Sequence, residues 1–454
     1  MAVEQLEQDD MQALILDGFA PRPHARYALR EIVDPTTAKS WLANIFECVV
    51  TAGSRRGRTG LQINLAFTFE GLEKLGLSET SGFLLPFREG MLARGPRELG
   101  DTNVNDWEWG RQSQSLHMLL MLFSEEGRLD EDWKQIEADL GGWSKPVIPP
   151  IDGRLSRTEQ FGFLDGISQP YIEGSNTSRR PSGDEARADI VKPGEFILGY
   201  LNEADTLPTT PTIPDALDPG NHLSRRPTEP GRRDFGRNGT YLVLRQLQQN
   251  VDEFNEFLVA HAPDDAARRL LAAKMIGRWP SGAPLVKAPD ADREALGEDN
   301  DFAYHESDPL GFACPVGAHI RRANPRDSLA EPARGVTPEM ALRETRRHRL
   351  IRRGRVYGDA AEGQGLMFLC LNANIQDQFE FVQHSWINSP RFGGLDRETD
   401  PLIGPRDKPE NCAITIPSPK GKQRIEGLAR FVEVKGGAYF FLPGIRALKC
   451  LANL

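Results

Sequence analysis

The sequence is poor in cysteine, and no part of it is long and apolar enough to cross a membrane. Its 454 residues contain five cysteines, none of them in a CxxC pair, so neither a structural zinc site nor a disulfide framework is expected. A membrane-spanning helix needs about 18 or more uninterrupted apolar residues, and no such run occurs. The first residues, MAVEQLEQDDMQ, are acidic and lack the basic and apolar regions of a signal peptide. We therefore expect a cytoplasmic protein without a membrane partner.

A basic excess is also missing. The 55 Lys and Arg residues are outnumbered by 65 Asp and Glu residues, which gives a formal net charge of −10. Binding to nucleic acid usually requires a basic face, so nucleic acid is not an expected partner. With 39% hydrophobic and 26% charged residues, the composition is typical of a globular protein, and the chain is long enough for two or three domains. These totals leave the oligomeric state open.

What the sequence does contain is a repeated pattern in which an apolar strand runs directly into an amphipathic helix. In one of these helices, Val251, Phe254 and Leu258 recur at helical spacing. The repeats fit either a parallel β-α-β sheet or a duplicated ferredoxin-like β-α-β-β-α-β unit. We favour an α+β fold of two ferredoxin-like domains with antiparallel sheets, because the helices are too few for a long doubly wound sheet. The pattern occurs at residues 61–77, 116–140, 239–258, 364–383 and 436–454.

Two stretches of irregular composition separate and interrupt these units. Residues 171–236 are rich in Pro, Gly, Arg and Asp, and only Glu195–Tyr200 (EFILGY) resembles a strand there. We interpret this stretch as an extended connection on the surface. The predicted boundaries are therefore an N-terminal domain at 1–170, the connection at 171–236 and a C-terminal domain at 237–454. A second irregular stretch, rich in Asp and Glu, spans residues 280–312.

One carboxylate, Asp165, stands in an apolar and glycine-punctuated stretch, EQFGFLDGISQP at Glu159–Pro170. Asp-Gly is a common turn dipeptide, because glycine adopts a positive φ without strain. The other interpretation is an acid–base group whose pKa is set by a surrounding pocket. The stretch by itself leaves both interpretations open.

Of the eight histidines, His319 has the most unusual neighbours. It lies in GFACPVGAHIRRANPRD, where the small residues Gly317 and Ala318 leave space for a flat group beside the imidazole. Three arginines follow it, and guanidinium groups bind carboxylates in a bidentate fashion. Haem is flat and carries two propionates, and imidazole is the commonest metal ligand. The alternative is a histidine that caps a short helix. The three arginines are Arg321, Arg322 and Arg326.

A second arginine cluster, HRLIRRGRVYG at His348–Gly358, contains Arg352 and Arg353 beside Gly354. A run of charges is most often a solvated turn. Half of this segment is apolar, however, which indicates that at least one arginine points inward, and a buried arginine needs an anion. Asp165, a propionate or a developing peroxide anion could each serve.

Three segments, taken together, resemble the signature segments of dye-decolorizing peroxidases, in the same order along the chain. They are GFLDG, AHIRRANPRD and IRRGRVYG. Further similar stretches extend the resemblance from about Leu61 to the C-terminus, and the chain is similar to the long bacterial form of the family. The resemblance implies two ferredoxin-like domains and one haem b, held mainly by the C-terminal domain.

The resemblance also implies roles for individual residues. His319 matches the proximal ligand of the haem iron, and Asp165 matches the distal acid–base residue. Arg352 matches the distal arginine, with Arg353 as the alternative if the alignment is displaced by one residue. Further positions expected at the haem are Leu366 and Phe368, which resemble the apolar pair of the distal wall, and Gly162 and Gly166, whose lack of a side chain would let the backbone approach the porphyrin.

A proximal histidine donates its second N–H to an acceptor, and two acceptors are candidates. Asn324 follows His319 by five residues. Asp400 lies in TDPLIG, a segment that resembles one on the proximal side in relatives. We favour Asp400, because an ionised acceptor forms a hydrogen bond roughly twice as strong as a neutral one. The alternative is that both are plain turn residues.

The function implied by the resemblance is that of a haem peroxidase. Such an enzyme reduces hydrogen peroxide through a ferryl porphyrin-radical intermediate and oxidises dyes and phenolic compounds in one-electron steps, with Mn(II) as a further candidate reductant. Tyr357 and Trp386 are candidates for relaying electrons to a buried haem. One alternative is a haem-binding or transport module without turnover, although storage needs no distal acid and arginine. The other is a non-haem interaction protein, in which Asp165 forms a turn and His319 caps a helix.

Overall fold

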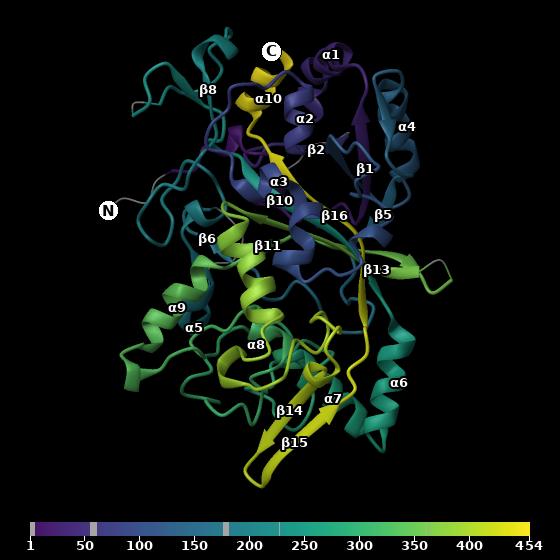
Figure 1. The fold of residues 1–454 in the computed structure, drawn as a ribbon, viewed down its shortest axis with the longest axis vertical. Coiled ribbons are helices and arrows are strands. Elements are labelled where there is room, and N and C mark those ends of the chain that lie inside the picture. Colours follow the sequence, from purple (N-terminus) through teal and green to yellow (C-terminus); the bar gives the residue numbers. More distant parts are fainter. Residues whose placement is uncertain (1–4, 55–60, 176–180, 227, 362) are drawn as a thin grey trace.

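The core of the structure is one antiparallel sheet of ten strands, which come from both halves of the chain (Figure 1). The computed structural model describes residues 5–54, 61–175, 181–226, 228–361 and 363–454. The strands run in the order β10-β16-β2-β3-β1-β5-β12-β13-β11, β4 pairs with β1, and a further pairing of β10 with β13 closes the sheet on itself. We call β10, β16, β2, β3, β1, β5, β12 and β13 the strand ring. Its strands and the two attached to it are β1 (His24–Ile32), β2 (Gln62–Phe67), β3 (Met118–Ser124), β4 (Ser144–Pro146), β5 (Ile151–Arg154), β10 (Thr240–Gln249), β11 (Ile351–Arg352), β12 (Arg355–Asp359), β13 (Gly363–Asn372) and β16 (Val432–Leu442).

The strand ring consists of two antiparallel halves that meet at narrow seams. Strands β1 to β5 come from the first half of the chain, and β10 to β16 come from the second. One seam pairs Phe441 with Phe67, and the other pairs Val356 with Arg154. The α+β fold with antiparallel sheets is therefore confirmed, whereas the exact domain boundaries stay a prediction.

Strands β2 and β3 of the ring bury both of their faces, which explains the continuous apolar runs in their sequences. On β3, Leu119 and Met121 pack into a cluster shared by both halves of the ring. Their neighbours Leu120 and Leu122 pack into a second cluster, with residues of the covering helices. This alternation follows from the two-residue period of a strand. The helices of the second cluster are α1 (Pro35–Ile45), α2 (Phe69–Lys74), α3 (Leu85–Arg94), α4 (Leu129–Leu140) and α10 (Ile445–Ala452).

The first and last helices of the chain lie side by side. Helix α10 packs against α1 at the end of the molecule where Figure 1 marks the C-terminus. Lys39 of α1 donates a hydrogen bond to the backbone oxygen of Leu454 over 2.8 Å. The C-terminal segment thus completes the helical layer of the N-terminal half.

The predicted strand at Glu195–Tyr200 is wrong. The structure describes all of these residues: Glu195 ends a short 3-10 helix, η6 (Pro193–Glu195), the other residues follow it, and none of them joins a strand. Phe196 and Ile197 both donate their amides to the oxygen of Pro193, a local pattern that excludes strand pairing. Their side chains fill the cluster shared by both halves of the ring. Residues 195–200 are therefore buried, and the expectation of an exposed connection is wrong for this segment. An apolar run can fill a core without forming a strand.

The rest of the connection is built from short elements on one side of the molecule. They are β6 (Tyr171–Ile172), α5 (Gly183–Asp189), β7 (Ile190–Val191), β8 (Thr212–Pro214) and β9 (Arg232–Asp234). Residues 176–180 and 227 of the predicted connection lie outside the described residues.

Below the ring in Figure 1, the second half of the chain forms a lobe of helices and long loops that ends in a projecting hairpin. The predicted helix after the strand at 364–372 is present as π-helical turns. None of the described helices has the length and hydropathy needed to cross a membrane. The elements of the lobe are α6 (Val251–His261), α7 (Asp265–Ile276), α8 (His319–Ala323), α9 (Pro338–Arg347), η10 (Gln376–Glu380), η11 (Val382–Ile387), β14 (Ala413–Ser418) and β15 (Gly421–Glu426).

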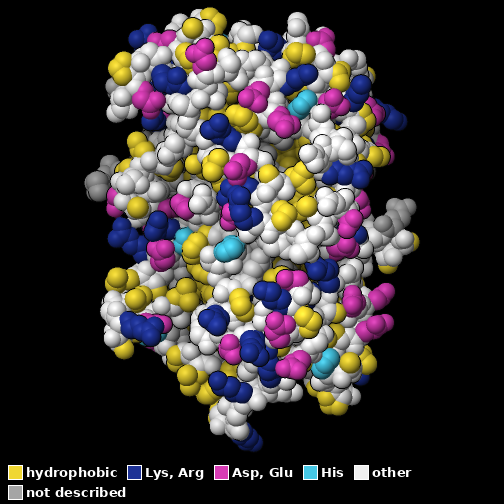
Figure 2. Space-filling view, viewed as in Figure 1, with side chains coloured by type: hydrophobic (Ala, Val, Ile, Leu, Met, Phe, Trp, Pro, Cys, Tyr) yellow, Lys and Arg dark blue, Asp and Glu magenta, His cyan; other side chains and the backbone are white. Residues whose placement is uncertain are grey.

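The surface carries charges of both signs. On the face shown in Figure 2, Lys and Arg side chains alternate with Asp and Glu side chains over the whole height of the molecule. This mixed pattern differs from the single-sign stripe that nucleic-acid binding proteins present.

Candidate active site

A cavity of about 290 Å³ lies between the strand ring and the lobe. Its wall on the ring side is the face of the second-half strands that points away from the shared cluster: Leu247 of β10, with Leu366 and Phe368 of β13. Its other walls come from α8, from residues 402–403 and from the loop at 159–168. Most of the lining is apolar, and most of it comes from the second half of the chain, as expected.

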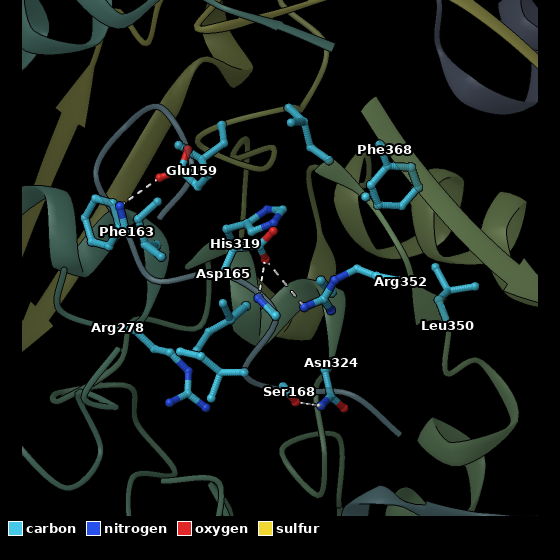
Figure 3. A pocket seen from close by; sticks show the side chains of 18 of the residues that line it. Glu159, Phe163, Asp165, Ser168, Arg278, His319, Asn324, Leu350, Arg352 and Phe368 are labelled. Carbon is cyan, nitrogen blue, oxygen red and sulfur yellow. Dashed lines mark hydrogen bonds and ion pairs between the residues drawn. The ribbon is translucent and has the colours of Figure 1, made fainter. Parts of the chain in front are cut away.

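His319 begins helix α8 and presents its ring to this cavity (Figure 3). Its Nδ1 lies 2.9 Å from Oδ2 of Asp400, which is fully buried. The other carboxylate oxygen of Asp400 accepts the amides of Leu402 and Ile403. An ionised carboxylate can only accept, so Nδ1 carries the proton and Nε2 is left for a ligand.

The pKa values of the pair move in opposite directions. Burial alone would lower the pKa of His319, but the charge and hydrogen bond of Asp400 outweigh burial and raise it. Burial alone would raise the pKa of Asp400, but the charge and hydrogen bond of His319, together with the amide of Ile403, hold it below its usual value. Each partner thus stabilises the charged form of the other.

Asp165 and Arg352 converge on the same cavity (Figure 3). Nη2 of Arg352 lies 3.9 Å from Oδ1 of Asp165, a distance that allows charge attraction but is too long for a hydrogen bond. Oδ1 also accepts the amide of Gly166 over 2.6 Å. The carboxylate is 40% exposed, and Asp165 itself is part of the cavity lining.

Arg353, the alternative to Arg352, faces the opposite way. Its guanidinium donates to the oxygens of Leu14, Ile15 and Arg352, on the far side of the strand from the cavity. Arg353 directly follows β11, and its amide still donates to the oxygen of Leu369 of β13. The alternation of side chains along a strand therefore extends to it, and only one member of the pair lines the cavity.

The other residues expected at the site are the two glycines of the loop at 159–168 and Asn324. Gly166 lines the cavity with φ 78°, whereas Gly162, with φ 89°, belongs to the same loop but is not among the described residues that line it. Both glycines adopt left-handed conformations that other residues disfavour. Asn324 lines the cavity, but its Nδ2 donates to Oγ of Ser168 over 3.4 Å, away from His319. Of the two candidate acceptors, Asp400 is the one bonded to His319.

The expectation that the arginines after His319 face an anionic ligand is wrong for Arg321 and Arg322. Both are buried and donate to backbone oxygens of neighbouring loops. Arg321 also pairs with Asp308. Arg326 does line the cavity, but its Nη1 donates to the oxygens of Asn300 and Phe302. Sequence gives no sign of these acceptors, because they are backbone oxygens, some a few residues upstream and others, at Trp386 and Glu398, in a distant segment.

Sequence reasoning missed three charged groups in the cavity wall: Glu159, Arg278 and Arg349. Glu159 accepts the amides of Phe161 and Phe163 and the side-chain amide of Gln249. Burial raises the pKa of Glu159 despite these bonds. Arg349 is buried and pairs with Asp189 of α5. The position of Glu159, six residues before Asp165 in the glycine-punctuated stretch, is a signal that could have identified it.

The two electron-relay candidates are buried core residues. Tyr357 packs into the cluster shared by both halves of the ring, and Trp386 packs against Phe381 and His348. Neither is among the described residues that line the cavity.

The side chains of this cavity fit a haem. The unbonded ring nitrogen of His319 suits an iron atom, since metal-ligating histidines usually donate their other N–H to a carboxylate or carbonyl. The apolar walls suit a macrocycle. The cavity is lined by more arginines than the carboxylates near them can neutralise, and an anionic cofactor would balance that excess. The arginines are Arg278, Arg326, Arg349 and Arg352.

Comparison with known proteins decides the family. A dye-decolorizing peroxidase from Exidia glandulosa is 30% identical and aligns with 99% of this chain and 87% of its own length. This chain belongs to the dye-decolorizing peroxidase family. No family model matches it, so the assignment depends on full-length relatives.

Solved structures agree with the family assignment. The fungal DyP-type peroxidase from Auricularia auricula-judae superimposes with a TM-score of 0.81 at 28% identity, covering 99% of this chain and 100% of that chain. A dye-decolorizing peroxidase in complex with 2,6-dimethoxyphenol superimposes with a TM-score of 0.78 at 28% identity, covering 98% and 100%. The ferredoxin-like α+β fold is confirmed, and the chain is a peroxidase of a haem-dependent family.

Proposed function

We propose that the chain binds haem b in this cavity, reduces hydrogen peroxide there and oxidises small phenolic or dye reductants. The observation that carries the proposal is the arrangement of two pairs around one apolar cavity: His319 with Asp400, and Asp165 with Arg352. The solved complex of a dye-decolorizing peroxidase with 2,6-dimethoxyphenol supports the class of reductant.

On the proximal side, Nε2 of His319 would hold the iron, and bound haem would supply the centre that binds peroxide and accepts its oxidising equivalents. Asp400 orients the imidazole and draws Nδ1–H towards itself, which makes Nε2 a stronger donor. The amides of Leu402 and Ile403 keep Asp400 in place.

On the distal side, Asp165 would move one proton. It accepts the proton that peroxide loses on binding and returns it to the oxygen that leaves as water. Arg352 lies beside it and stabilises the negative charge that develops on the departing oxygen. Leu366 and Phe368 line the cavity and would present an apolar wall to this step.

The decisive experiment replaces Asp165 by Asn. The amide cannot accept and return the proton, so Asp165→Asn should keep its Soret band and react with peroxide about 10²–10³-fold more slowly. Stopped-flow mixing with peroxide measures this. An unchanged rate would remove Asp165 from the mechanism.

His319→Ala tests the proximal side. The strand ring and its helices have their own apolar cores, so the variant should fold but retain little haem. Wild-type haem content and unchanged iron spectra would exclude His319 as the ligand.

The two neighbouring arginines provide an internal control. Arg352→Leu should slow the peroxide reaction with little change in the Soret band. Arg353→Leu should instead lower thermal stability, because its bonds join β11 to the N-terminal segment. The reverse result would show that Arg353 is the distal arginine.

Turnover separates this proposal from a haem-binding or transport module. Peroxide-dependent oxidation of a dye by the purified haem protein supports the enzyme, and haem binding without it supports the module. For Mn(II), the described residues hold no group of three or more His, Cys, Asp or Glu side chains able to bind a metal ion. Mn(II) oxidation, like a cytoplasmic location, stays a prediction.

A further inference from the structure

The distance between Asp165 and Arg352 is not set by a bond between their side chains. The two groups lie 3.9 Å apart and come from segments almost two hundred positions apart in the sequence. Asp165 belongs to a loop without regular secondary structure, and Arg352 ends the two-residue strand β11. Other contacts must therefore fix where the loop lies against the strand.

Gln169 makes such a contact. Its Oε1 accepts the backbone amide of Arg352 over 3.0 Å. Strand β11 is the last in the order of the sheet, with β13 on one side only. The amide of Arg352 points to the open edge, where an unpaired N–H needs an acceptor. One side chain thus joins the backbone that carries Asp165 to the backbone that carries Arg352.

A second bond holds the residue before Gln169. Nη2 of Arg349 donates to the oxygen of Ser168 over 3.2 Å. Arg349 is itself held by Asp189, which is almost completely buried. Residues 168 and 169 of the loop are therefore held by residues 349 and 352 of one short segment.

Gln169 does not belong to the described lining of the cavity, whereas Arg349 does. Any effect of Gln169 on the chemistry must therefore pass through the groups that it connects. Displacing a reacting group by about 1 Å can cost on the order of 10²-fold in rate. A variant of Gln169 can thus test geometry without changing a group that touches peroxide.

We propose that Gln169 is a positioning residue that sets the separation of the Asp165 carboxylate from the Arg352 guanidinium, and thereby the rate of the peroxide step. This inference rests on the proposed function of Asp165. It adds to the two reacting groups a residue, Gln169, whose hydrogen bond to the Arg352 amide fixes their relative position.

The test compares three variants of the loop. Gln169→Leu removes the acceptor at similar size, and Gln169→Glu keeps an acceptor of the same length. Gln160→Leu is the matched control, because Gln160 lies in the same loop and its Nε2 has no partner among the described residues. We expect the peroxide rate to fall about 10–100-fold in Gln169→Leu, to recover most of its value in Gln169→Glu and to stay unchanged in Gln160→Leu.

Cyanide binding gives a readout apart from turnover. Cyanide enters as HCN and, like peroxide, must lose a proton to bind iron, so its association rate should fall in the same proportion in Gln169→Leu. A normal cyanide rate beside a slow peroxide rate would overturn the proposal. If Gln169→Leu does not fold, Gln169→Asn replaces it, since the shorter amide cannot reach Arg352; a wild-type rate in that variant also overturns it.

A double-mutant cycle separates this proposal from the one on which it rests. If Gln169 acts through Asp165, Gln169→Leu should slow an Asp165→Asn protein no further. Independent, multiplying losses would overturn the positioning role. A wild-type rate in Asp165→Asn alone would overturn the proposed function, whereas a slow Asp165→Asn beside a wild-type Gln169→Leu overturns this inference only.

Discussion

In the strand ring, backbone groups bond to neighbouring strands, whereas around the cavity many of them bond to arginine side chains. We call residues 278–326 and 386–406 the cavity loops; in them α8 is the only α-helix that the structure describes. Arg322 alone donates to four backbone oxygens, those of residues 317, 386, 389 and 398. Other buried arginines of these loops bond in the same manner: Arg278, Arg321 and Arg326.

The difference shows how an irregular backbone can be buried next to a cofactor. A buried carbonyl without a partner costs about 1–3 kcal/mol, and loops provide few partners of their own. One guanidinium presents five N–H donors in a rigid fork and can serve several loops at once. Burial lowers the pKa of Arg322 to about 10, which still leaves it charged at neutral pH.

The largest predicted effect is that of removing such an arginine. Arg322→Met leaves three buried carbonyls and the half-buried one of Ser389 without their donor, a loss of about 4 kcal/mol or more in local stability. We expect faster hydrogen exchange in residues 386–398 and weaker haem retention. Arg334→Met is the control, since its side chain is 80% exposed; equal effects in the two variants would contradict the comparison.

The corresponding change in the strand ring removes packing instead of hydrogen bonds. Leu119 is fully buried in the cluster shared by both halves of the ring, so Leu119→Ala should lower the free energy of unfolding by about 3–4 kcal/mol. The Soret band of the haem-loaded variant should not change. Denaturant unfolding measures the loss, and Leu207→Ala, at a site 58% exposed, should show almost none. A shifted Soret band in Leu119→Ala would show that ring and cavity are not independent.

A buried acid in the connection extends the comparison to pH. Burial is the main cause that raises the pKa of Glu195 to about 7. The negative charge of Glu203 also raises this pKa, whereas the hydrogen bond that the backbone amide of Glu203 donates to Glu195 lowers it. Between pH 4.5 and 7 the folded chain keeps a proton that the unfolded chain has lost, so stability falls as the pH rises through this window. A shift of this size corresponds to about 3 kcal/mol.

Glu195→Gln removes this pH dependence while keeping an oxygen that can accept the Glu203 amide. Unfolding midpoints of the two proteins should differ little at pH 4.5, and the variant should be the more stable at pH 8. Stability curves that run parallel across the window would show that Glu195 titrates normally.

The smallest predicted effect concerns the hydrogen bond between His319 and Asp400, through which the cavity loops would influence the cofactor. Asp400→Asn removes the charge behind His319 and should slow the peroxide reaction or weaken haem binding about 10–100-fold, as loss of such hydrogen-bond partners of metal ligands does elsewhere. The Fe(III)/Fe(II) potential should rise, because the ligand donates less to iron. Asn324→Ala should leave the potential unchanged. A shift in Asn324→Ala alone would reverse the assignment of the acceptor.

The same contrast explains what could be predicted from the sequence. The strands that run into helices were predictable, because a short apolar run followed by a helical period can be recognised locally in segments such as 116–140. The expected positions of Asp165, His319 and Arg352 came from local motifs, and the cavity brings these three together. Arg353 could be separated from Arg352 only once the face of β11 was known.

What sequence did not predict depends on contacts between distant segments. The run at Glu195–Tyr200 resembles a strand, yet it fills the shared cluster of the ring as an irregular segment. Arg321 and Arg322 resemble ligand-binding arginines, yet both donate to backbone oxygens. Three of the acceptors of Arg322, at residues 386, 389 and 398, lie in a segment that only the fold brings near. The same is true of Gln169, whose partner lies 183 positions away.

The closure of the strand ring restricts the order in which a newly made chain can fold on the ribosome. Strand β16 lies between β10 and β2 and is made after both of them. Until β16 leaves the ribosome, β2 and β10 each keep an unpaired edge, the kind of surface through which nascent chains associate. The first half of the molecule also waits for α10, which covers α1. Completion of the native structure therefore follows synthesis of the last strand and does not proceed half by half.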